Sequence, residues 1–106
     1  MLIVKKFGGS SVADKERIFN VARRVSEDYK AGHDVVVVLS AMGKTTDGLI
    51  AQAREINPKG SKREMDMLLT CGEQISVALM AMALESLGIP SISLNAWQVP
   101  IYTAST

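Results

Sequence analysis

The chain alternates between short apolar runs and longer stretches in which apolar residues recur at helical spacing. The first apolar run starts the strand predicted over residues 2–6. The second, over residues 34–39, holds four consecutive valines and a leucine. The continuous apolar start of the first is typical of a strand that is buried on both faces of a parallel sheet, and the second should lie centrally in the sheet. Between them, residues 14–31 place apolar side chains on one helical face, which predicts a helix that ends at Gly32 in a left-handed cap.

The second half of the chain is predicted to be mostly helical. A helix over residues 47–55 would be capped by Thr46 or Asp47 and would stop before the Asn-Pro-Lys-Gly sequence at 57–60. Residues 91–94 alternate small polar and apolar side chains and are predicted to form a third strand. A loop over residues 95–99 should follow it.

A long helical pattern begins after Ser61, which forms a capping box with Glu64. Gly72 costs about 1 kcal/mol relative to alanine inside a helix, so we predict a break there, between helices over 62–70 and 73–87. The second of these is apolar nearly all round and should be buried in the complete protein. The full order is β-α-β-α-α-β, which predicts parallel strands joined by right-handed crossovers.

Composition narrows the class of protein. The 106 residues suit one small domain, and the net charge of +1 gives no reason to expect nucleic acid or an acidic membrane as partner. The single cysteine, Cys71, favours a reducing, cytoplasmic setting. We expect no signal peptide, and the longest strongly apolar run, residues 75–84, is too short to span a bilayer. Residues 99–106 supply no element that would close a sheet, so we expect a chain cut within a larger domain.

The candidate site lies beyond the predicted strands, because ligands of open α/β sheets bind at the carboxyl ends of the strands. Lys6 stands beside the double glycine of Gly8 and Gly9, where a tight turn can present backbone N–H groups and a lysine charge to a phosphate. An ordinary strand-to-helix turn with a surface lysine is the alternative. The Walker A and GxGxxG patterns are both absent from the sequence.

Two further groups of residues are candidates for binding a small polar substrate. Ser40, Thr45 and Thr46 offer hydroxyls after the second strand, although helix capping alone would also explain the threonines. Glu73 is expected at a helix start, where the helix dipole would stabilise it by about 0.3–1 kcal/mol. Its functional alternative is to bind a cation such as an ammonium group. No group of residues in the sequence has metal-ligand spacing.

Three segments in order resemble the signature motifs of the aspartokinases, a family within the amino acid kinase superfamily. They are Val4-Lys5-Lys6-Phe7-Gly8-Gly9-Ser10-Ser11-Val12, Val36-Val37-Val38-Leu39-Ser40-Ala41-Met42-Gly43 with Thr45-Thr46-Asp47, and Met65-Asp66-Met67-Leu68-Leu69-Thr70-Cys71-Gly72-Glu73-Gln74-Ile75-Ser76. Ser10 stands where the family often has threonine, and Gln74 where arginine is common. The resemblance covers the whole chain. It implies an α/β fold, a parallel-sheet three-layer sandwich of amino acid kinase type, of which residues 1–106 would be the N-terminal portion.

The resemblance also implies an activity, which is the ATP-dependent phosphorylation of the side-chain carboxylate of L-aspartate. Lys6 matches the lysine that contacts the ATP phosphates and stabilises the transferring phosphoryl group. The remaining residues of the phosphate end would be Phe7, Gly8, Gly9, Ser10 and Ser40. Aspartate would be bound by Thr45, Thr46 and Glu73. ATP would bring Mg²⁺, without evident protein ligands in this chain.

The same resemblance implies 4-phospho-L-aspartate as product, at the first step towards lysine, threonine and methionine, in a homo-oligomer or in assembly with the rest of an aspartokinase chain. Residues 1–106 alone are then expected to be inactive, because the parts that hold the nucleotide base and the regulatory domains would follow Thr106. Two alternatives stay open. One is another kinase of the superfamily, acting on glutamate or acetylglutamate. The other is a non-catalytic α/β binding or assembly module.

Overall fold

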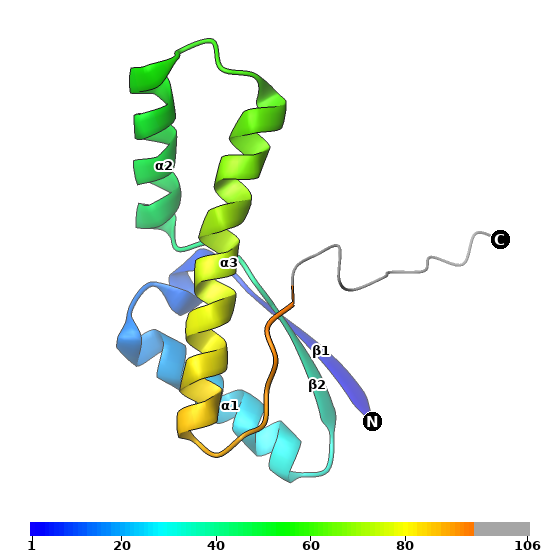
Figure 1. Ribbon diagram of the computed structural model, residues 1–106. Coiled ribbons are helices and arrows are strands. Elements are labelled where there is room, and N and C mark those ends of the chain that lie inside the picture. Colours follow the sequence, from blue (N-terminus) through cyan, green and yellow to red (C-terminus); the bar gives the residue numbers. More distant parts are fainter. Residues whose placement is uncertain (95–106) are drawn as a thin grey trace, which may run out of the picture.

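The computed structural model describes residues 1–94, which form two strands, one 3₁₀ turn and three helices (Figure 1). In chain order these elements are β1 (Leu2–Phe7), η1 (Gly9–Val12), α1 (Lys15–Lys30), β2 (Asp34–Leu39), α2 (Gly43–Ile56) and α3 (Lys62–Ser86). Helices α1 and the C-terminal half of α3 lie on one side of the strands, whereas α2 and the N-terminal half of α3 extend beyond the end of the sheet (Figure 1).

The two strands pair in parallel, as predicted, with Leu2 opposite Asp34 and Phe7 opposite Leu39. The backbone N–H of Ser40 donates to the Phe7 carbonyl at 3.2 Å, so the pairing continues one residue past the end of β2. This register brings the carboxyl ends of both strands to the same point. The segments that follow them, the Gly8–Gly9 turn and the start of α2, therefore begin side by side.

Helix α1 confirms the pattern read from the sequence. Its buried apolar residues lie on one face, and the Asp14 carboxylate caps it by accepting a hydrogen bond from the Arg17 backbone N–H at 2.8 Å. Gly32 follows its end with φ of 95°, a left-handed conformation that favours glycine. The core that α1, α3 and β2 form with η1 and with the segment after α3 consists of Val12, Ile18, Val21, Ala22, Val25, Leu39, Met80, Ala83, Leu84 and Ile89.

The opposite face of the sheet is bare. Leu2 and Val4 of β1 are more than 60% exposed, and Val36 and Val38 of β2 are also exposed, whereas Val35 and Val37 pack against the core. The expectation that the first strand is buried on both faces is therefore wrong for residues 1–94. The fold is α/β with a parallel sheet, and the described residues supply two layers of the expected three-layer sandwich.

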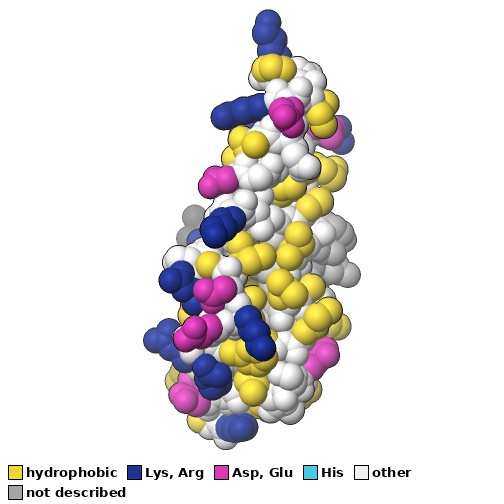
Figure 2. Space-filling model, turned by 90° about the vertical axis from the view of Figure 1, so that its left-hand side faces the viewer, with side chains coloured by type: hydrophobic (Ala, Val, Ile, Leu, Met, Phe, Trp, Pro, Cys, Tyr) yellow, Lys and Arg dark blue, Asp and Glu magenta, His cyan; other side chains and the backbone are white. Residues whose placement is uncertain are grey.

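A second apolar surface runs between the helices. Side chains from the start of α1 and the C-terminal half of α3, together with Met42, line an open groove of about 420 Å³. Leu79 and Met82 contribute its α3 side, and Met82 is 62% exposed. Figure 2 shows hydrophobic side chains gathered along the length of this side of the molecule. The second half of α3 is thus only partly buried by the described residues.

Helix α3 runs without interruption through Gly72, so the predicted break between residues 70 and 73 is wrong. Packing explains the difference, because Gly72 is buried where α3 crosses the start of α2. A Cβ built on Gly72 would lie 3.0 Å from the Ala41 Cβ. The glycine thus permits close contact between two segments and does not end the helix. At its start, Ser61 caps α3 as predicted, since its Oγ accepts from the Glu64 N–H at 3.3 Å.

Helix α3 is longer than the apolar run that the sequence analysis judged too short to span a membrane. By length and composition it could cross a bilayer, a test that the run over residues 75–84 alone would not pass. Core helices of soluble proteins have the same length and composition, so α3 is weak evidence for a membrane-spanning segment. Helix α3 packs against α1, α2 and β2.

Helix α2 begins at Gly43, four residues earlier than predicted, so Ser40–Ala41–Met42 alone form the connection from β2. Met42 occupies the N-cap without a side-chain hydrogen bond, and the Thr46 N–H donates to the Met42 carbonyl at 3.0 Å. The prediction that Thr46 or Asp47 caps this helix is therefore wrong. These hydroxyl and carboxyl side chains belong to its first two turns.

The third strand predicted at residues 91–94 is also absent. These residues form neither helix nor strand, and the described sheet contains β1 and β2 alone. An alternating pattern makes a strand only beside a hydrogen-bonding partner, and within residues 1–94 this segment has none. Its one side-chain anchor in that range is the Ser91 hydroxyl, which donates to the Ala81 carbonyl of α3 at 3.3 Å. The loop predicted at 95–99 lies outside the described residues.

A pair of glycine substitutions tests the packing at Gly72. Both Gly48→Ala and Gly72→Ala replace a glycine inside a helix, which by itself should stabilise the protein by about 1 kcal/mol. A Cβ at Gly48 meets no atom within 4 Å, so Gly48→Ala should raise the midpoint of urea unfolding followed by circular dichroism. At Gly72 crowding costs about 1–3 kcal/mol, so the midpoint should not rise and is expected to fall. Equal gains for both variants would show that Gly72 is not a packing contact.

Candidate functional site

The predicted site residues gather where β1 and β2 end, and glycine makes the first contact between them possible. Gly9 begins η1 directly beyond β1 and lies against the backbone that leaves β2. A Cβ built on Gly9 would fall 2.5 Å from the Ala41 carbonyl oxygen and 3.4 Å from the Gly43 nitrogen. Only a residue without a side chain fits there, so the first two motifs touch through their backbones.

The third motif reaches the same point from α3. The position of a Gly72 Cβ would lie 3.0 Å from the Ala41 Cβ and 3.6 Å from the Thr45 methyl group. Ala41 therefore has Gly9 on one side and Gly72 on the other. Three segments that lie about 30 residues apart along the chain meet at this one alanine. The structure thus brings together the three motifs that the sequence presents separately.

The two lysines at the end of β1 point to opposite faces of the sheet, as successive strand residues must. Lys5 lies on the covered face, where its ammonium pairs with the Asp28 carboxylate of α1. Lys6 is exposed on the bare face and makes no ion pair within residues 1–94. The structure therefore gives Lys5 a structural partner and leaves the Lys6 charge available beside the Gly8–Gly9 turn.

The turn itself presents backbone donors. Gly8 is exposed and extended, and its carbonyl accepts from the Ser11 N–H at 3.1 Å. Gly9 and Ser10 occupy the first positions of η1, where N–H groups have no acceptor inside the helix. Phe7 differs from the rest of the set, because its side chain packs against the core. Its contribution at this edge is the carbonyl that binds the Ser40 N–H.

The hydroxyl residues after β2 lie at the adjoining segment. Ser40 is half-buried immediately after the strand, and Thr45 and Thr46 are half-buried in the first turn of α2. The N–H groups of that turn have no side-chain cap from Met42. A helix start of this kind carries partial positive charge and favours an anionic group, such as a carboxylate.

Glu73 stands in the middle of α3, so the prediction that it lies at a helix start is wrong. The prediction that the helix dipole stabilises Glu73 is wrong for the same reason, since that effect fades beyond the first turn. The residue is exposed, follows the buried Gly72, and makes no ion pair within residues 1–94. It is thus a carboxylate held at the level of Ala41 without a structural partner in that range.

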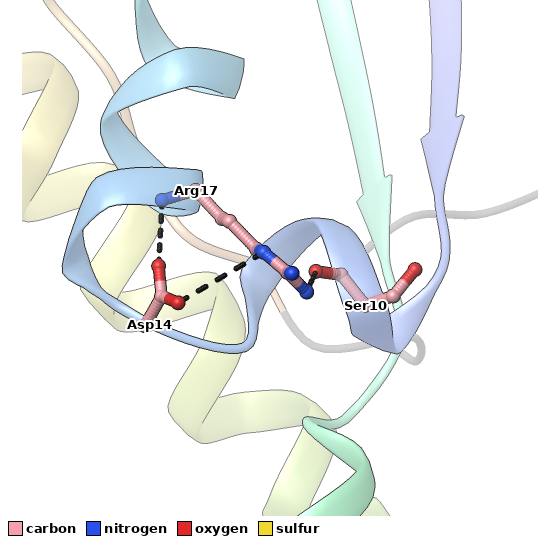
Figure 3. Close-up of polar contacts among 3 residues, drawn as sticks. All are labelled: Ser10, Asp14 and Arg17. Carbon is pink, nitrogen blue, oxygen red and sulfur yellow. Dashed lines mark hydrogen bonds and ion pairs between the residues drawn. The ribbon is translucent and has the colours of Figure 1, made fainter.

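One residue near the site was missed by the sequence analysis. Arg17 of α1 reaches back to η1, where its Nη1 donates to the Ser10 carbonyl at 2.9 Å (Figure 3). Its Nε lies 3.9 Å from the Asp14 carboxylate, the same group that caps α1. The Asp-x-x-Arg spacing at the start of a predicted helix was visible in the sequence, but the contact with Ser10 depends on how α1 leaves η1.

Both the sequence and the fold of this chain match those of known proteins. The model of the amino acid kinase family matches residues 1–105. The chain belongs to the amino acid kinase family. Among solved structures, this family member resembles the aspartate kinase from Synechocystis with a TM-score of 0.85 and 52% identity, over 89% of this chain and 16% of the other.

Curated relatives of this chain include aspartokinases. The aspartokinase of Bacillus sp. strain MGA3 is 59% identical over 102 residues, and that of Mycolicibacterium smegmatis is 58% identical over 105 residues. These matches cover 96% and 99% of this chain, and 25% of each relative. The chain therefore spans about a quarter of the length of the relatives that it matches. The resemblance to aspartokinases drawn from the three motifs is confirmed.

Proposed function

We propose that residues 1–106 form the N-terminal, aspartate-binding portion of an aspartate kinase, which transfers the γ-phosphoryl group of ATP to the side-chain carboxylate of L-aspartate. The observation that carries the proposal is the meeting of the three motif segments at Ala41, through Gly9 and Gly72. The likeness to aspartokinases of Bacillus and Mycolicibacterium supports it. The product would be 4-phospho-L-aspartate, at the first step towards lysine, threonine and methionine.

The phosphate end of the site is assigned to the end of β1. Phosphoryl transfer needs positioned positive charge and backbone donors more than a covalent nucleophile. Lys6 supplies an exposed ammonium, and Gly8, Gly9 and Ser10 supply a turn whose first N–H groups have no internal acceptor. Ser40 adjoins them through its bond to Phe7. Phe7 serves through its backbone, because its side chain belongs to the core.

The aspartate end is assigned to α2 and α3. Thr45 and Thr46, in the first turn of α2, would bind a substrate carboxylate through their hydroxyls and through the Thr45 backbone N–H, since the Thr46 N–H is already bonded to the Met42 carbonyl. Glu73 would bind the substrate ammonium group, since it is exposed and makes no ion pair within residues 1–94. The accepting carboxylate of aspartate is already ionised at neutral pH, so the transfer requires no general base from the protein.

Mg²⁺ is implied by the family and would be carried by ATP. In the part of the chain that the structure describes, no three His, Cys, Asp or Glu side chains gather as a metal site. Mg²⁺ is usually bound through substrate phosphates and water, with few protein ligands. When bound with ATP, the ion neutralises charge on the phosphates. No residue of this chain is assigned as its ligand.

The uncovered surfaces support an assembly of the site with further protein. The bare sheet face carries Leu2, Val4, Val36 and Val38, and the groove between α1 and α3 is also apolar. We propose the remainder of an aspartokinase chain, or a second copy, as the cover. This also favours the enzyme over the alternative of a self-contained binding module, because such a module would bury these surfaces by itself.

A segment exchange tests the proposal directly. The matched segment of the M. smegmatis aspartokinase is replaced with the 105 residues of this chain that match it, which gives a full-length protein called here the exchange enzyme. ATP-dependent phosphorylation of aspartate by the exchange enzyme is the expected result, with glutamate turned over far more slowly. Residues 1–106 alone should show no transfer. An exchange enzyme that folds but phosphorylates no aspartate, or prefers glutamate, would overturn the proposal.

Glu73→Ala in the exchange enzyme should raise the KM for aspartate about 10- to 100-fold, the effect of losing one hydrogen bond between charged groups. The KM for ATP should stay near its parent value. Glu85→Ala is the matched control, because Glu85 is exposed on the same helix, about 18 Å further along. An unchanged aspartate KM in Glu73→Ala, or an equal rise in Glu85→Ala, would remove the substrate role from Glu73. Steady-state kinetics with each substrate varied in turn provide the measurement.

A further inference from the structure

The turn that follows β1 is held in place at three points. Gly9 is fixed by its contact with the Ala41–Gly43 backbone, and Val12, fully buried, anchors the far end of η1 in the core. Between them Ser10 is exposed, and the only side chain of the described residues that hydrogen-bonds to its backbone is Arg17 of α1. The middle of the proposed phosphate turn thus depends on a residue from the next helix.

The geometry points to Arg17 as a positioning residue for the phosphate-binding turn, acting through the Ser10 carbonyl. The inference rests on the proposed function for its kinetic consequence. Arg17 would not touch either substrate. It would set the direction of the peptide groups that do so.

Arg17 and Gly8 both hydrogen-bond to one peptide group of the turn. A trans peptide is planar, so its C=O and N–H point in opposite directions. In the peptide that joins Ser10 to Ser11, the carbonyl accepts from Arg17 Nη1 at 2.9 Å. Its N–H donates to the Gly8 carbonyl at 3.1 Å. The same plane is therefore held from both sides, which fixes how the turn passes from Gly8 into η1.

Arg17 is itself held in position by Asp14. The Asp14 carboxylate accepts from the Arg17 backbone N–H at 2.8 Å and lies 3.9 Å from its Nε. Figure 3 shows the guanidinium between the Asp14 carboxylate and the Ser10 carbonyl, with the Ser10 hydroxyl pointing away from Arg17. Asp14 thereby couples the start of α1 to the turn. The guanidinium is occupied on the α1 side of Ser10, which leaves the hydroxyl side free for a ligand.

A competing explanation is general attraction of ATP by positive charge. Arg17 and Arg24 line a shallow polar pocket beside Ser10 and Ser11, so their charges lie near the turn. Charge attraction and positioning differ in two measurable ways. Attraction between exposed charges weakens with salt, whereas the orientation of a backbone turn does not. Only positioning changes the mobility of the turn in the absence of ATP.

The first arm of the test is kinetic and uses the exchange enzyme. Arg17→Met keeps the length and apolar stem of the side chain and removes its donors, and should raise the KM for ATP about fivefold. The KM for aspartate should stay near the parent value, and the effect should persist between 50 and 300 mM KCl. Arg23→Met is the matched control, since Arg23 is exposed on α1 and bonds to Asn20 of the same helix. It should leave the ATP KM unchanged.

The second arm measures amide hydrogen exchange of the peptides that cover residues 8–12, by mass spectrometry without nucleotide. Exchange there should be faster in Arg17→Met than in the parent and in Arg23→Met, while peptides of β2 should be unchanged. Equal exchange in both variants, or an ATP effect that vanishes at high salt, would overturn the inference. This arm needs no catalysis. An exchange enzyme that phosphorylates no aspartate would defeat the proposed function while the exchange rates still decide the role of Arg17.

Discussion

Replacing Lys6 with alanine is expected to lower the kcat of the exchange enzyme for aspartate phosphorylation about 10²- to 10³-fold, the effect of removing one donor from developing charge. Lys6 is the exposed lysine on the bare face of β1, beside the turn that presents Gly9 and Ser10. Its ammonium would stabilise charge on the phosphoryl group as transfer proceeds. The KM for aspartate should change little, because that substrate is bound by residues of α2 and α3.

Lys5→Ala is the control for this prediction. The two lysines are neighbours of the same type, but Lys5 points to the covered face and pairs with Asp28. A partly exposed ion pair contributes little, so Lys5→Ala should leave kcat within about twofold of the parent. Steady-state and single-turnover kinetics on both variants provide the measurement. A large loss in Lys5→Ala with little in Lys6→Ala would reverse the assignment of the two faces.

The second large effect is expected from Gly9→Ala. A Cβ at this position would lie 2.5 Å from the Ala41 carbonyl oxygen, which is backbone and cannot rotate away. The phosphate turn and the segment that leads to Thr45 must therefore move apart by about 1 Å, and a misplacement of that size can cost about 10²-fold in rate. We expect kcat/KM to fall by about that factor for both substrates, with a higher KM for aspartate.

Gly8→Ala separates crowding from the mere addition of a methyl group. A Cβ at Gly8 meets no atom within 4 Å, and its φ of −79° is open to any residue. The methyl group could disturb ATP at most, so the KM for aspartate should stay at its parent value. If Gly9→Ala left the aspartate KM unchanged, or Gly8→Ala raised it equally, the contact at Ala41 would not couple the two halves of the site.

The sequence pattern correctly predicted the helices and strands that depend on propensity and capping by nearby residues. The valines of β2 have high strand propensity, and Asp14 and Gly32 carry the capping chemistry of α1 within a few residues of its ends. The parallel pairing followed from a helix between two strands. Ser61 and Glu64 placed the start of α3 correctly for the same reason.

Two of the wrong predictions concern structure that depends on residues far away in the sequence. Gly72 suggests a break by propensity, but it lies inside α3 because Ala41 occupies the space that a side chain would fill. Residues 91–94 have the alternation of a strand, yet within residues 1–94 no strand pairs with them. Helix α2 starts at Gly43 although Met42 offers no capping side chain. The contact of Gly72 with Ala41, and the partner that a strand over residues 91–94 would need, both involve residues that no short sequence window contains.

In the candidate site, the sequence likewise predicted the residues better than their positions. The sequence named the lysine, the glycine turn, the threonines and Glu73, because three ordered motifs resemble those of a known family. It assigned Glu73 the wrong place, at a helix start, and offered no reason to separate Lys5 from Lys6 beyond that resemblance. The structure distinguishes the two lysines, because Lys5 pairs with Asp28 of α1 and Lys6 lies on the opposite face of the strand.

By itself, the sequence determined the α/β class, the parallel strands and the ends of α1, since propensity, capping and periodicity act over a few residues. It also identified the three motifs, through their resemblance to those of the aspartokinases. Only the tertiary structure decided that Gly9 and Gly72 meet at Ala41, that Lys6 lies on the bare face, and that Arg17 holds Ser10. These are contacts between elements. They depend on strand register and on how closely two backbones can approach, which the order of residues along one element does not specify.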